Sequence, residues 1–464
     1  MSYQWQIIKN IDELLREDKV CDKCLRARKV ALRLIEEGLK AADPYKVVYN
    51  SIEVQGPIIK VCGIEFKPSR IFIVGFGKAS INMAKAVEDK LKDKICEGVI
   101  SAPKTLKDEH VKLTKIKIVW SGHPYPDEGS IKAGRLISEL VKEAKEDDLV
   151  IALVSGGGSA LMEYPANNIT LSDFIKTTEL LLKSGAVIQE INAVRKHISL
   201  VKGGWLAYYA YPAKLVSLII SDVVGDDLSS IASGPTVPDP TTFNDAVSVL
   251  KKYGIWDKVP DTVRKYLSNG LSGKVPETPK PGDKVFNNVH NFIVASNIVS
   301  LKRMAGIGRG LGYNTIILTS LLEGEAREVG KVLASIALDS KMHGIPVEPP
   351  AIILAGGETT VTVRGKGKGG RNQELALSAA FKLANNHGIA LASVGSDGID
   401  GITPYAGGII DAHSINRAIK LELNPEEILM NNNSYEFFKN LGDGIYTGPT
   451  GTNVNDFQVI IIER

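Results

Sequence analysis

The chain has 464 residues, of which 44% are apolar and 23% are charged, with 56 Lys and Arg against 53 Asp and Glu. This is the composition of an ordinary globular protein, long enough for two domains, and it excludes a disordered chain or a fibrous repeat. The formal net charge is only +3 and no run of five basic residues occurs, so nothing indicates binding to nucleic acid or an anionic membrane. A small molecule is the partner class that remains.

Neither a membrane span nor a disulfide framework is expected. No stretch of 18 apolar residues occurs, and no charged segment followed by an apolar one opens the chain, so we expect a cytoplasmic protein. Cys21 and Cys24 form a C-x-x-C pair, but no second pair and no histidine stands at zinc spacing, and no strand precedes them. We therefore expect two thiols on a helix face, with a metal or redox role as the alternative.

The first half of the chain alternates between predicted helices and apolar strands. Residues 31–39 have apolar positions at helical spacing, which predicts an amphipathic helix. The apolar run at 71–74 leads into a Gly-rich turn and a helix over 81–91. Apolar runs at 149–154 and 215–220 are followed by similar turns. Buried strands that alternate with helices predict a parallel α/β sheet covered on both faces.

Prolines mark the middle of the chain and a second α/β region follows them. Six prolines lie between 238 and 281, which indicates a domain connection. Strand-like runs then occur at 291–295, 315–319, 351–354, 389–394 and 458–462. We predict a Rossmann-like α/β domain over 1–240 with a helical segment at its start, a connection over 241–285, and a smaller C-terminal α/β domain over 286–464. The sequence leaves open which sheet takes the last strand.

A glycine-rich loop follows the predicted strand at 149–154. It consists of Ser155, Gly156, Gly157, Gly158 and Ser159. Backbone N–H groups in such a loop can hold an anion, so we expect it to bind nucleotide phosphates. A tight strand-to-helix turn without a ligand is the alternative. The sequence has neither the P-loop signature nor the protein-kinase motifs.

Lys78 lies inside the turn that follows the strand at 71–74. The turn reads Gly75-Phe-Gly-Lys-Ala-Ser80, one residue short of the dinucleotide fingerprint. A cation held at the end of a strand can face a phosphate or a carboxylate. A solvated lysine at the start of a helix is the alternative.

Acidic residues follow the strand at 215–220. Asp222, Asp226 and Asp227 lie within six residues, where carboxylates suit Mg²⁺ that is also bound by phosphate oxygens. Helix capping by Asp226 or Asp227 is the competing interpretation. A second acidic group, at 395–401, is equally consistent with a Gly/Asp turn.

The most polar stretch runs from Gly356 to the helix predicted over 372–384. We assign Gly356, Gly357 and Glu358 to nucleotide binding. A Gly/Lys hairpin then leads into Arg371, which could bind a substrate carboxylate with the help of the helix N-terminal amides. A surface hairpin with a solvated arginine is the alternative.

A hydrolase is disfavoured because the chain has no G-x-S-x-G nucleophile elbow. His123 and His197 are the only histidines near motif-like residues, and both fit better as loop or core hydrogen-bonding groups. The polar loop at 447–456 could be a turn only.

Taken together, the motifs resemble glycerate 2-kinases of the MOFRL-domain type. They occur in the family's order over roughly residues 70–460: Val74-Gly-Phe-Gly-Lys-Ala79, Ser121-Gly-His-Pro-Tyr-Pro-Asp127, Val154-Ser-Gly-Gly-Gly-Ser-Ala160, Ser221-Asp-Val-Val-Gly-Asp-Asp227, Ala232-Ser-Gly-Pro-Thr236, Gly356-Gly-Glu-Thr359, Gly370-Arg-Asn-Gln-Glu374, Ser396-Asp-Gly-Ile-Asp-Gly401 and Thr447-Gly-Pro-Thr-Gly-Thr-Asn453. The resemblance implies two α/β domains with the active site in a cleft between them, ATP with Mg²⁺ or another divalent cation, and D-glycerate as the acceptor. The family's cleft lysine falls on Lys78 and its cleft arginine on Arg371.

The hypothesis is therefore phosphoryl transfer from ATP to the C2 hydroxyl of D-glycerate. Arg371 would bind the glycerate carboxylate and Lys78 the phosphate charge. The loop at 155–159 would hold the nucleotide phosphates, Asp226 would bind Mg²⁺, and Asp222 would orient or deprotonate the hydroxyl. The rivals are an NAD(P)H-dependent hydroxypyruvate reductase and a non-catalytic sensor of sugar acids or nucleotides. The oligomeric state stays open, a homodimer included.

Overall fold

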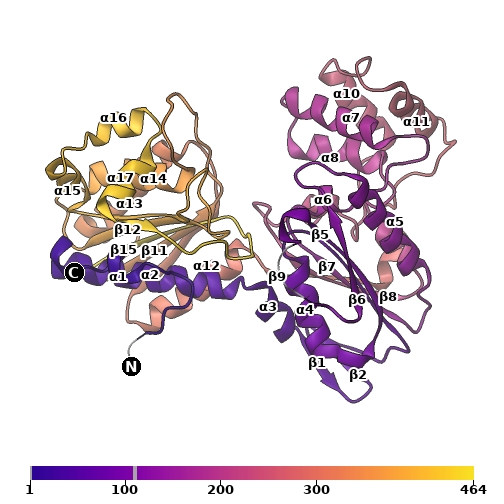
Figure 1. The fold of residues 1–464 in the computed structure, drawn as a ribbon, viewed down its shortest axis with the longest axis horizontal. Helices are drawn as coiled ribbons and strands as arrows, with labels where there is room; N and C mark the ends of the chain where they lie inside the picture. Colours follow the sequence, from indigo (N-terminus) through magenta and orange to yellow (C-terminus); the bar gives the residue numbers. More distant parts are fainter. Residues whose placement is uncertain (1–2, 108–111) are drawn as a thin grey trace. The chain divides into compact units, whose positions relative to one another are not determined.

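The chain folds into two compact units (Figure 1). The structure, a computed structural model, describes residues 3–107 and 112–464. Pro44–Val294 forms one unit, and Met1–Asp43 together with Ala295–Arg464 forms the other. This division differs from the expected boundaries at 240 and 286, because residues up to Val294 belong to the first unit. The first 43 residues belong to the other unit, because the N-terminal helix packs on its sheet.

The unit Pro44–Val294 is built on a six-stranded sheet, which agrees with the predicted α/β class. The strands are β4 (Ile71–Phe76), β5 (Ile95–Pro103), β6 (Ile116–Ser121), β7 (Leu149–Val154), β8 (Lys214–Ile220) and β9 (Val289–Ala295), in the order β6-β5-β4-β7-β8-β9. The first five pair in parallel. Every residue of β4 and β7 is buried, as expected of strands covered on both faces. The sequence wrongly placed β9 in the second α/β region, and it lies beside β8 here.

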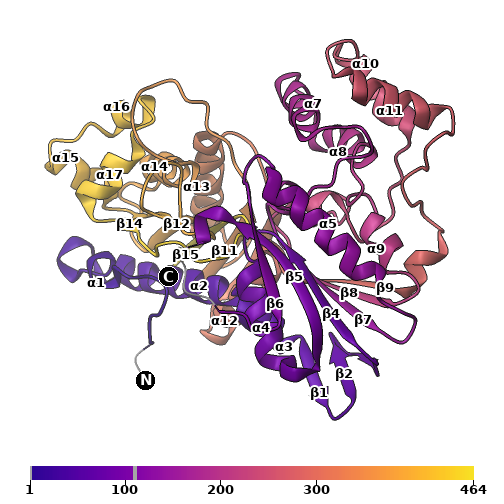
Figure 2. The same cartoon turned by 45° about the vertical axis from the view of Figure 1, so that its right-hand side comes forward.

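Helices cover both faces of this sheet (Figure 2). Helices α5 (Glu128–Lys142) and α9 (Trp205–Ala210) share a core with Phe72, Val74 and Phe76 of β4, and α4 (Ser80–Leu91) packs on the opposite face. Asp127 caps α5, because its carboxylate accepts the Ser130 N–H at 3.0 Å. The unit also holds α3 (Pro44–Asn50) and a small antiparallel sheet of β1 (Ile52–Gln55), β2 (Ile58–Val61) and β3 (Ile64–Phe66).

A group of helices in the same unit has a core of its own. It comprises α7 (Leu171–Lys183), α8 (Ile188–His197), α10 (Phe243–Lys252) and α11 (Asp261–Leu271). Phe174, Phe243 and Leu250 are among its buried side chains. Two of these helices come from the Pro-rich stretch, so much of the expected connection at 241–285 folds against the preceding residues.

The second unit contains a mixed six-stranded sheet. Its strands are β10 (Asn314–Leu322), β11 (Ala351–Gly357), β12 (Ile389–Gly395), β13 (Gly407–Asp411), β14 (Gly444–Ile445) and β15 (Asp456–Ile462), in the order β10-β11-β15-β12-β13-β14. The last strand of the chain, β15, is antiparallel to both β11 and β12. The open question about this strand is thereby answered, since it is central to the second sheet.

Helices lie on both faces of the second sheet as well (Figure 1). Helices α2 (Asp22–Ala41) and α12 (Asn297–Gly310) cover one face, and α13 (Ala326–His343), α14 (Arg371–Leu383) and α17 (Ser434–Leu441) cover the other. Shorter helices are α1 (Ile11–Leu14), α15 (Ser414–Lys420) and α16 (Pro425–Met430). Within the described ranges 3–107 and 112–464, no helix is both long and apolar enough to cross a membrane.

Candidate functional site

The predicted phosphate loop lies where the first sheet reverses its strand order. From β4 the chain moves outward to β5 and β6, then returns to the other side of β4 with β7 and continues to β8. The chain therefore leaves β4 and β7 in opposite directions along the sheet, and the first residues of both loops lie side by side at its carboxyl edge. In doubly wound α/β folds this switch point is where ligands bind. Lys78 follows β4, and Ser155 to Gly158 follow β7.

The two loops are joined by hydrogen bonds. The Lys78 N–H donates to the Gly156 carbonyl oxygen at 2.9 Å, and the Ala79 N–H donates to Ser155 Oγ at 3.1 Å. Gly77 has a φ of +127° and no room for a side chain, since a Cβ there would lie 2.2 Å from Ser155 Oγ. The cation and the glycine loop are therefore held beside each other by the backbone.

Gly156 and Gly157 are each pressed against a polar side chain. A Cβ at Gly156 would lie 1.9 Å from Asp222 Oδ2, and a Cβ at Gly157 would lie 3.0 Å from His123 Nε2. The same Cβ at Gly157 would lie 3.3 Å from Lys78 Cγ. The structure thus brings Lys78, Asp222 and His123 to one loop. The absence of a side chain at Gly156 and Gly157 is therefore needed for the approach of Asp222 and His123, in addition to any role in ligand binding.

Lys78 and His123 are the basic side chains that this loop brings beside Gly157. The Lys78 side chain is exposed and makes no ion pair with the described part of the chain. Part of the His123 side chain is exposed too, yet partial burial and then the charge of Lys78 lower the pKa of His123 below its usual value. The lowered pKa favours the neutral imidazole of His123, so Lys78 is the cation of this pair.

Ser159 belongs to a buried polar network that the sequence did not predict. Its Oγ lies 2.8 Å from Ser233 Oγ, which in turn hydrogen-bonds Asn192 Oδ1. Its carbonyl oxygen accepts from Arg195 Nη2 and from Lys202 Nζ, at 3.2 and 2.9 Å. Ser159 therefore links three other segments of the chain by hydrogen bonds, and its hydroxyl is less available to phosphate than expected.

The chain around Ser233 is in an unusual conformation. Ala232, Ser233 and Gly234 have φ values of +50°, +62° and +63°. Left-handed backbone at two consecutive non-glycine residues is costly and tends to occur at functional sites. In the sequence, this segment stood out only as the motif Ala232-Ser-Gly-Pro-Thr236, which contributed to the family resemblance but was given no role.

The remaining acidic residues of the first unit have different roles. Asp227 accepts hydrogen bonds from the Ser229 N–H and the Ser230 Oγ, at 3.0 and 2.6 Å, so it stabilises a turn. Asp226 has a φ of +57°, and its carboxylate has no hydrogen bond or ion pair with the residues described. It remains available to a cation, although within those residues it is not part of a cluster of three acidic or other metal-binding side chains.

In the second unit, Arg371 is bound to two carboxylates. Its Nε and Nη2 donate to Asp456 at 2.6 and 2.9 Å, and its Nη1 donates to Glu358. Burial opposes the charge of Arg371, but Asp456 and Glu358 outweigh burial and raise the pKa of Arg371, so it stays protonated. The Asp456 side is buried and the Glu358 side is half exposed. The sequence missed Asp456, which lies 85 residues away.

The amides expected to assist Arg371 are already occupied. Asp400 accepts the backbone N–H groups of Asn372 and Gln373, at 3.0 and 2.9 Å, and also the Gln373 side-chain amide. Gly370 leaves room for this carboxylate, since a Cβ there would lie 2.3 Å from Asp400 Oδ1. Two of the N-terminal amides of α14 are therefore taken by Asp400, which acts as a helix cap, so their help in binding a substrate stays a prediction.

The loop before Arg371 is not the hairpin that the sequence suggested. Residues 361–370 form no strand, and the N–H groups of Gly365, Lys366 and Lys368 donate to the side chains of Asn432, Asn431 and Asn433. Three consecutive asparagines thus replace a strand partner.

Gly356 and Gly357 are explained by neighbours in the same unit. A Cβ at Gly356 would lie 2.1 Å from Asn297 Oδ1, and one at Gly357 would lie 2.3 Å from the Leu322 carbonyl oxygen. Gly357 also has a φ of +148°. Packing of the chain therefore accounts for both glycines without a nucleotide.

Two known domain families match this chain. The domain of unknown function DUF4147 matches residues 30–268, and the MOFRL family matches residues 351–456. The fold and these matches define a two-domain α/β protein of the DUF4147/MOFRL class. The chain belongs to the glycerate 2-kinase family that combines these domains.

Relatives in this family cover nearly the whole chain. The glycerate 2-kinase of Pyrococcus horikoshii is 46% identical over 94% of this chain and 97% of its own. A putative hydroxypyruvate reductase of Agrobacterium vitis is 42% identical, with 94% of each covered. The crystal structure of a glycerate kinase from Thermotoga maritima matches with a TM-score of 0.84 and 39% identity, over 94% of this chain and 99% of that one.

Proposed function

We propose that this chain transfers the terminal phosphoryl group of ATP to the C2 hydroxyl of D-glycerate and so forms 2-phosphoglycerate and ADP. The observation that carries the proposal is the convergence of Lys78, Asp222 and the glycine loop at the β4/β7 switch point. Similarity to glycerate 2-kinases from Pyrococcus and Thermotoga supports the choice of substrate.

The switch point suits a phosphate better than it suits a nicotinamide cofactor. Lys78, which has no ion pair within residues 3–107 and 112–464, brings a positive charge to the turn after β4. Ser80 stands in this turn where a dinucleotide fold would need a third glycine. In phosphoryl transfer the protein contributes positioning and charge neutralisation. We assign Lys78 to the charge of the transferred phosphate and the backbone of residues 155–159 to the nucleotide phosphates.

A divalent cation fits the acidic residues of this loop. The Asp226 carboxylate has no partner among the residues that the structure describes, and Mg²⁺ commonly uses one or two protein carboxylates together with phosphate oxygens. When bound, Mg²⁺ would neutralise charge on the phosphates. We therefore assign Asp226 to the cation. Asp222, fixed against Gly156, is assigned to orient the C2 hydroxyl of glycerate and accept its proton.

Arg371 is the proposed ligand of the glycerate carboxylate. Asp456 holds the Nε edge of the guanidinium, and the Nη1 atom contacts the half-exposed Glu358. A substrate carboxylate can replace Glu358 at Nη1 while the bidentate pair with Asp456 stays in place. Of the three residues assigned to the nucleotide at the end of β11, we keep Glu358, because packing already explains Gly356 and Gly357.

Turnover with ATP, Mg²⁺ and D-glycerate tests the proposal when it is coupled to enolase, which accepts 2-phosphoglycerate and not its 3-isomer. We expect a signal that depends on both glycerate and ATP. The Agrobacterium relative makes the reductase the second candidate, so the same preparation is assayed with hydroxypyruvate and NADH or NADPH. Oxidation of the nicotinamide without enolase signal would replace the kinase proposal with the reductase.

A further inference from the structure

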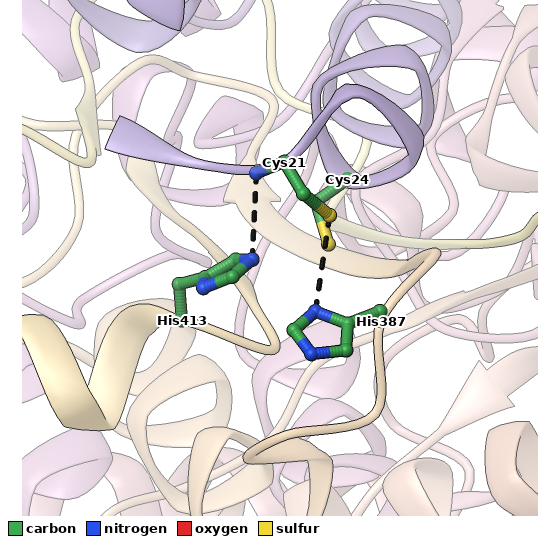
Figure 3. A group of neighbouring side chains, drawn as sticks. All are labelled: Cys21, Cys24, His387 and His413. Carbon is green, nitrogen blue, oxygen red and sulfur yellow. Dashed lines mark hydrogen bonds between the residues drawn. The ribbon is translucent and has the colours of Figure 1, made fainter. Parts of the chain in front are cut away.

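Four side chains with metal-binding atoms meet in the unit that contains the second sheet. Cys21 and Cys24 come from the start of α2, His387 from the turn before β12, and His413 from the residue before α15. One ligand atom of each lies within 4.8 Å of the other three. Figure 3 shows the four side chains beside one another, with His387 turned towards the sulfur atoms and His413 Nε2 accepting the Cys21 backbone N–H at 3.4 Å, a bond that metal binding through this nitrogen would replace. None of them takes part in the proposed kinase reaction.

The local backbone explains how the four residues come together. Cys21 is the N-cap of α2 and Cys24 is the third residue of that helix, and this spacing places both sulfur atoms on one side. The left-handed residues Asn385 and Gly388, with φ values of +63° and +82°, form the turn that presents His387. The His413 N–H donates to Asp411 Oδ1 at 2.7 Å, which fixes the start of its loop.

The distances match a tetrahedral zinc site with small adjustments. Zn–S bonds of about 2.3 Å and Zn–N bonds of about 2.0 Å place tetrahedral ligand atoms about 3.3–3.8 Å apart. Cys21 Sγ already lies 3.8 Å from His387 Nδ1 (Figure 3). The two imidazole rings have centroids 4.8 Å apart, at 48° to each other. Since all four ligand atoms lie within 4.8 Å of one another, side-chain shifts of about 1–1.5 Å bring the most distant pair into range.

The donor set selects the metal. Two sulfur and two nitrogen ligands in tetrahedral arrangement are typical of zinc. Two thiolates and two neutral imidazoles leave a Zn²⁺ complex without net charge, which suits a site where Cys24 is buried. We propose that Cys21, Cys24, His387 and His413 bind one Zn²⁺, with release of the two thiol protons. Four protein ligands close the coordination sphere, so the site is structural rather than catalytic.

Neighbouring groups support the proposed ligands. The Gly388 N–H points at Cys24 Sγ from 3.3 Å, a hydrogen bond that stabilises a thiolate. Lys341 Nζ holds the His387 carbonyl oxygen at 2.6 Å. Arg28 binds Asp411 at 2.7 Å and so anchors the loop of His413. The first contact is of the kind that supports a metal ligand, and the other two hold the segments that carry His387 and His413 in place.

A bound zinc ion would tie the N-terminal helix to the second sheet. Cys21 and His387 are 366 residues apart, and the whole unit Pro44–Val294 lies between them in the chain. A cross-link that closes so long a loop removes many conformations from the unfolded chain. The ion would thus keep α2 on β12 and β15. The sequence did not reveal this site, because His387 and His413 lie in turns far along the chain from Cys21 and Cys24.

Metal analysis of the full chain, purified without a metal-affinity tag, tests the proposal. We expect about one zinc per chain in the wild type and a loss of most of it in Cys21→Ser and in His413→Asn. Cys62→Ser and Cys96→Ser are matched controls, since both cysteines lie in the other unit. Chelation under reducing conditions should lower the midpoint temperature of unfolding by more than about 5 °C, and added zinc should restore it.

Cobalt titration of the chelated wild type keeps the test independent of variants that fail to fold. One equivalent of Co²⁺ should give thiolate charge-transfer absorption and the strong d–d bands of tetrahedral cobalt. His387→Asn should weaken these bands. Zinc retained by the double variant Cys21→Ser/Cys24→Ser would overturn the proposal. So would a reduced protein that takes up neither metal, or a preparation in which these four residues hold another metal instead of zinc.

Discussion

The carboxylate of Asp222 lies directly against the Cα atom of Gly156, where a Cβ would stand only 1.9 Å from Oδ2. Gly156 is therefore the residue that lets the acid after β8 reach the loop after β7. The pair joins the proposed base to the proposed phosphate loop, and disturbing one residue must move the other.

Substitution of Gly156 by alanine tests this relationship. The added methyl group must displace the Asp222 carboxylate, so we expect kcat for glycerate phosphorylation to fall at least about tenfold, which corresponds to ~1.4 kcal/mol in the barrier. Gly306→Ala is the matched control, because a Cβ at Gly306 meets nothing within 4 Å. Steady-state kinetics of both variants checks the prediction. If Gly156→Ala and Gly306→Ala had equal kcat values, Gly156 would have no role in the active site.

The titration of His123 reports whether Lys78 lies beside it in solution. Partial burial and the charge of Lys78 both lower the pKa of His123, so its NMR titration should have a midpoint below 6.5. Lys78→Met removes the charge and should move this midpoint upward, whereas Lys78→Arg should leave it low. An unchanged midpoint in Lys78→Met would place the lysine elsewhere.

The same shift predicts a dependence of stability on pH. Because the pKa of His123 is lower in the folded chain, folding favours the neutral imidazole. The contribution of His123 to the free energy of unfolding is therefore present above its unfolded pKa of about 6.5 and is lost as the pH falls through the folded pKa. The wild type should lose stability relative to His123→Asn between pH 7 and pH 5 in denaturant titrations, and parallel curves would refute this.

Arg371→Ala tests the assignment of the glycerate carboxylate. Loss of a charge-assisted contact should raise the KM for glycerate between about tenfold and a hundredfold and leave the KM for ATP nearly unchanged. Arg364→Ala is the control, since Arg364 is an exposed arginine in the preceding loop. A circular dichroism melt of Arg371→Ala checks that the loss of the ion pair with the buried Asp456 has not unfolded the unit. An equal rise in both KM values would reject the assignment.

Arg28 should be essential for the stability of the second unit. Its guanidinium binds Asp411 at 2.7 Å and Asp443 at 2.6 Å, and all three side chains are fully buried. Arg28→Met would leave two buried carboxylates without this partner, which should cost ~3–5 kcal/mol in the free energy of unfolding. Lys85→Met breaks the exposed pair with Asp89 and should cost less than about 1 kcal/mol. Similar losses in the two variants would contradict this.

The strands that could be predicted are those with a strong local signal. The runs at 71–74, 149–154 and 389–394 are apolar throughout because both sheet faces are covered, and each became β4, β7 or β12. The α/β class followed from them. The division into units did not follow, because the sequence shows that residues 31–39 form one face of a helix but not which sheet that face covers.

The site could be predicted only in part, for a similar physical reason. Lys78 and the loop at 155–159 were found from their positions after strands, and the sheet brings them together. Asp456 beside Arg371 and Asp400 at the N-terminus of α14 depend on contacts 85 and 28 residues apart in sequence. No local pattern in the sequence indicates such partners. Arg371 was therefore expected to have no carboxylate partner within the chain, although it binds Asp456 and Glu358.

The position of the new phosphate group tests the central proposal most directly. The purified chain is incubated with ATP, Mg²⁺ and D-glycerate, and the product is examined by ³¹P NMR without proton decoupling. A phosphate on C2 couples to one neighbouring proton and gives a doublet, which is the result that we predict. A triplet would place the phosphate on C3, beside two protons, and inorganic phosphate alone would show hydrolysis without transfer. Either of these results would contradict a glycerate 2-kinase.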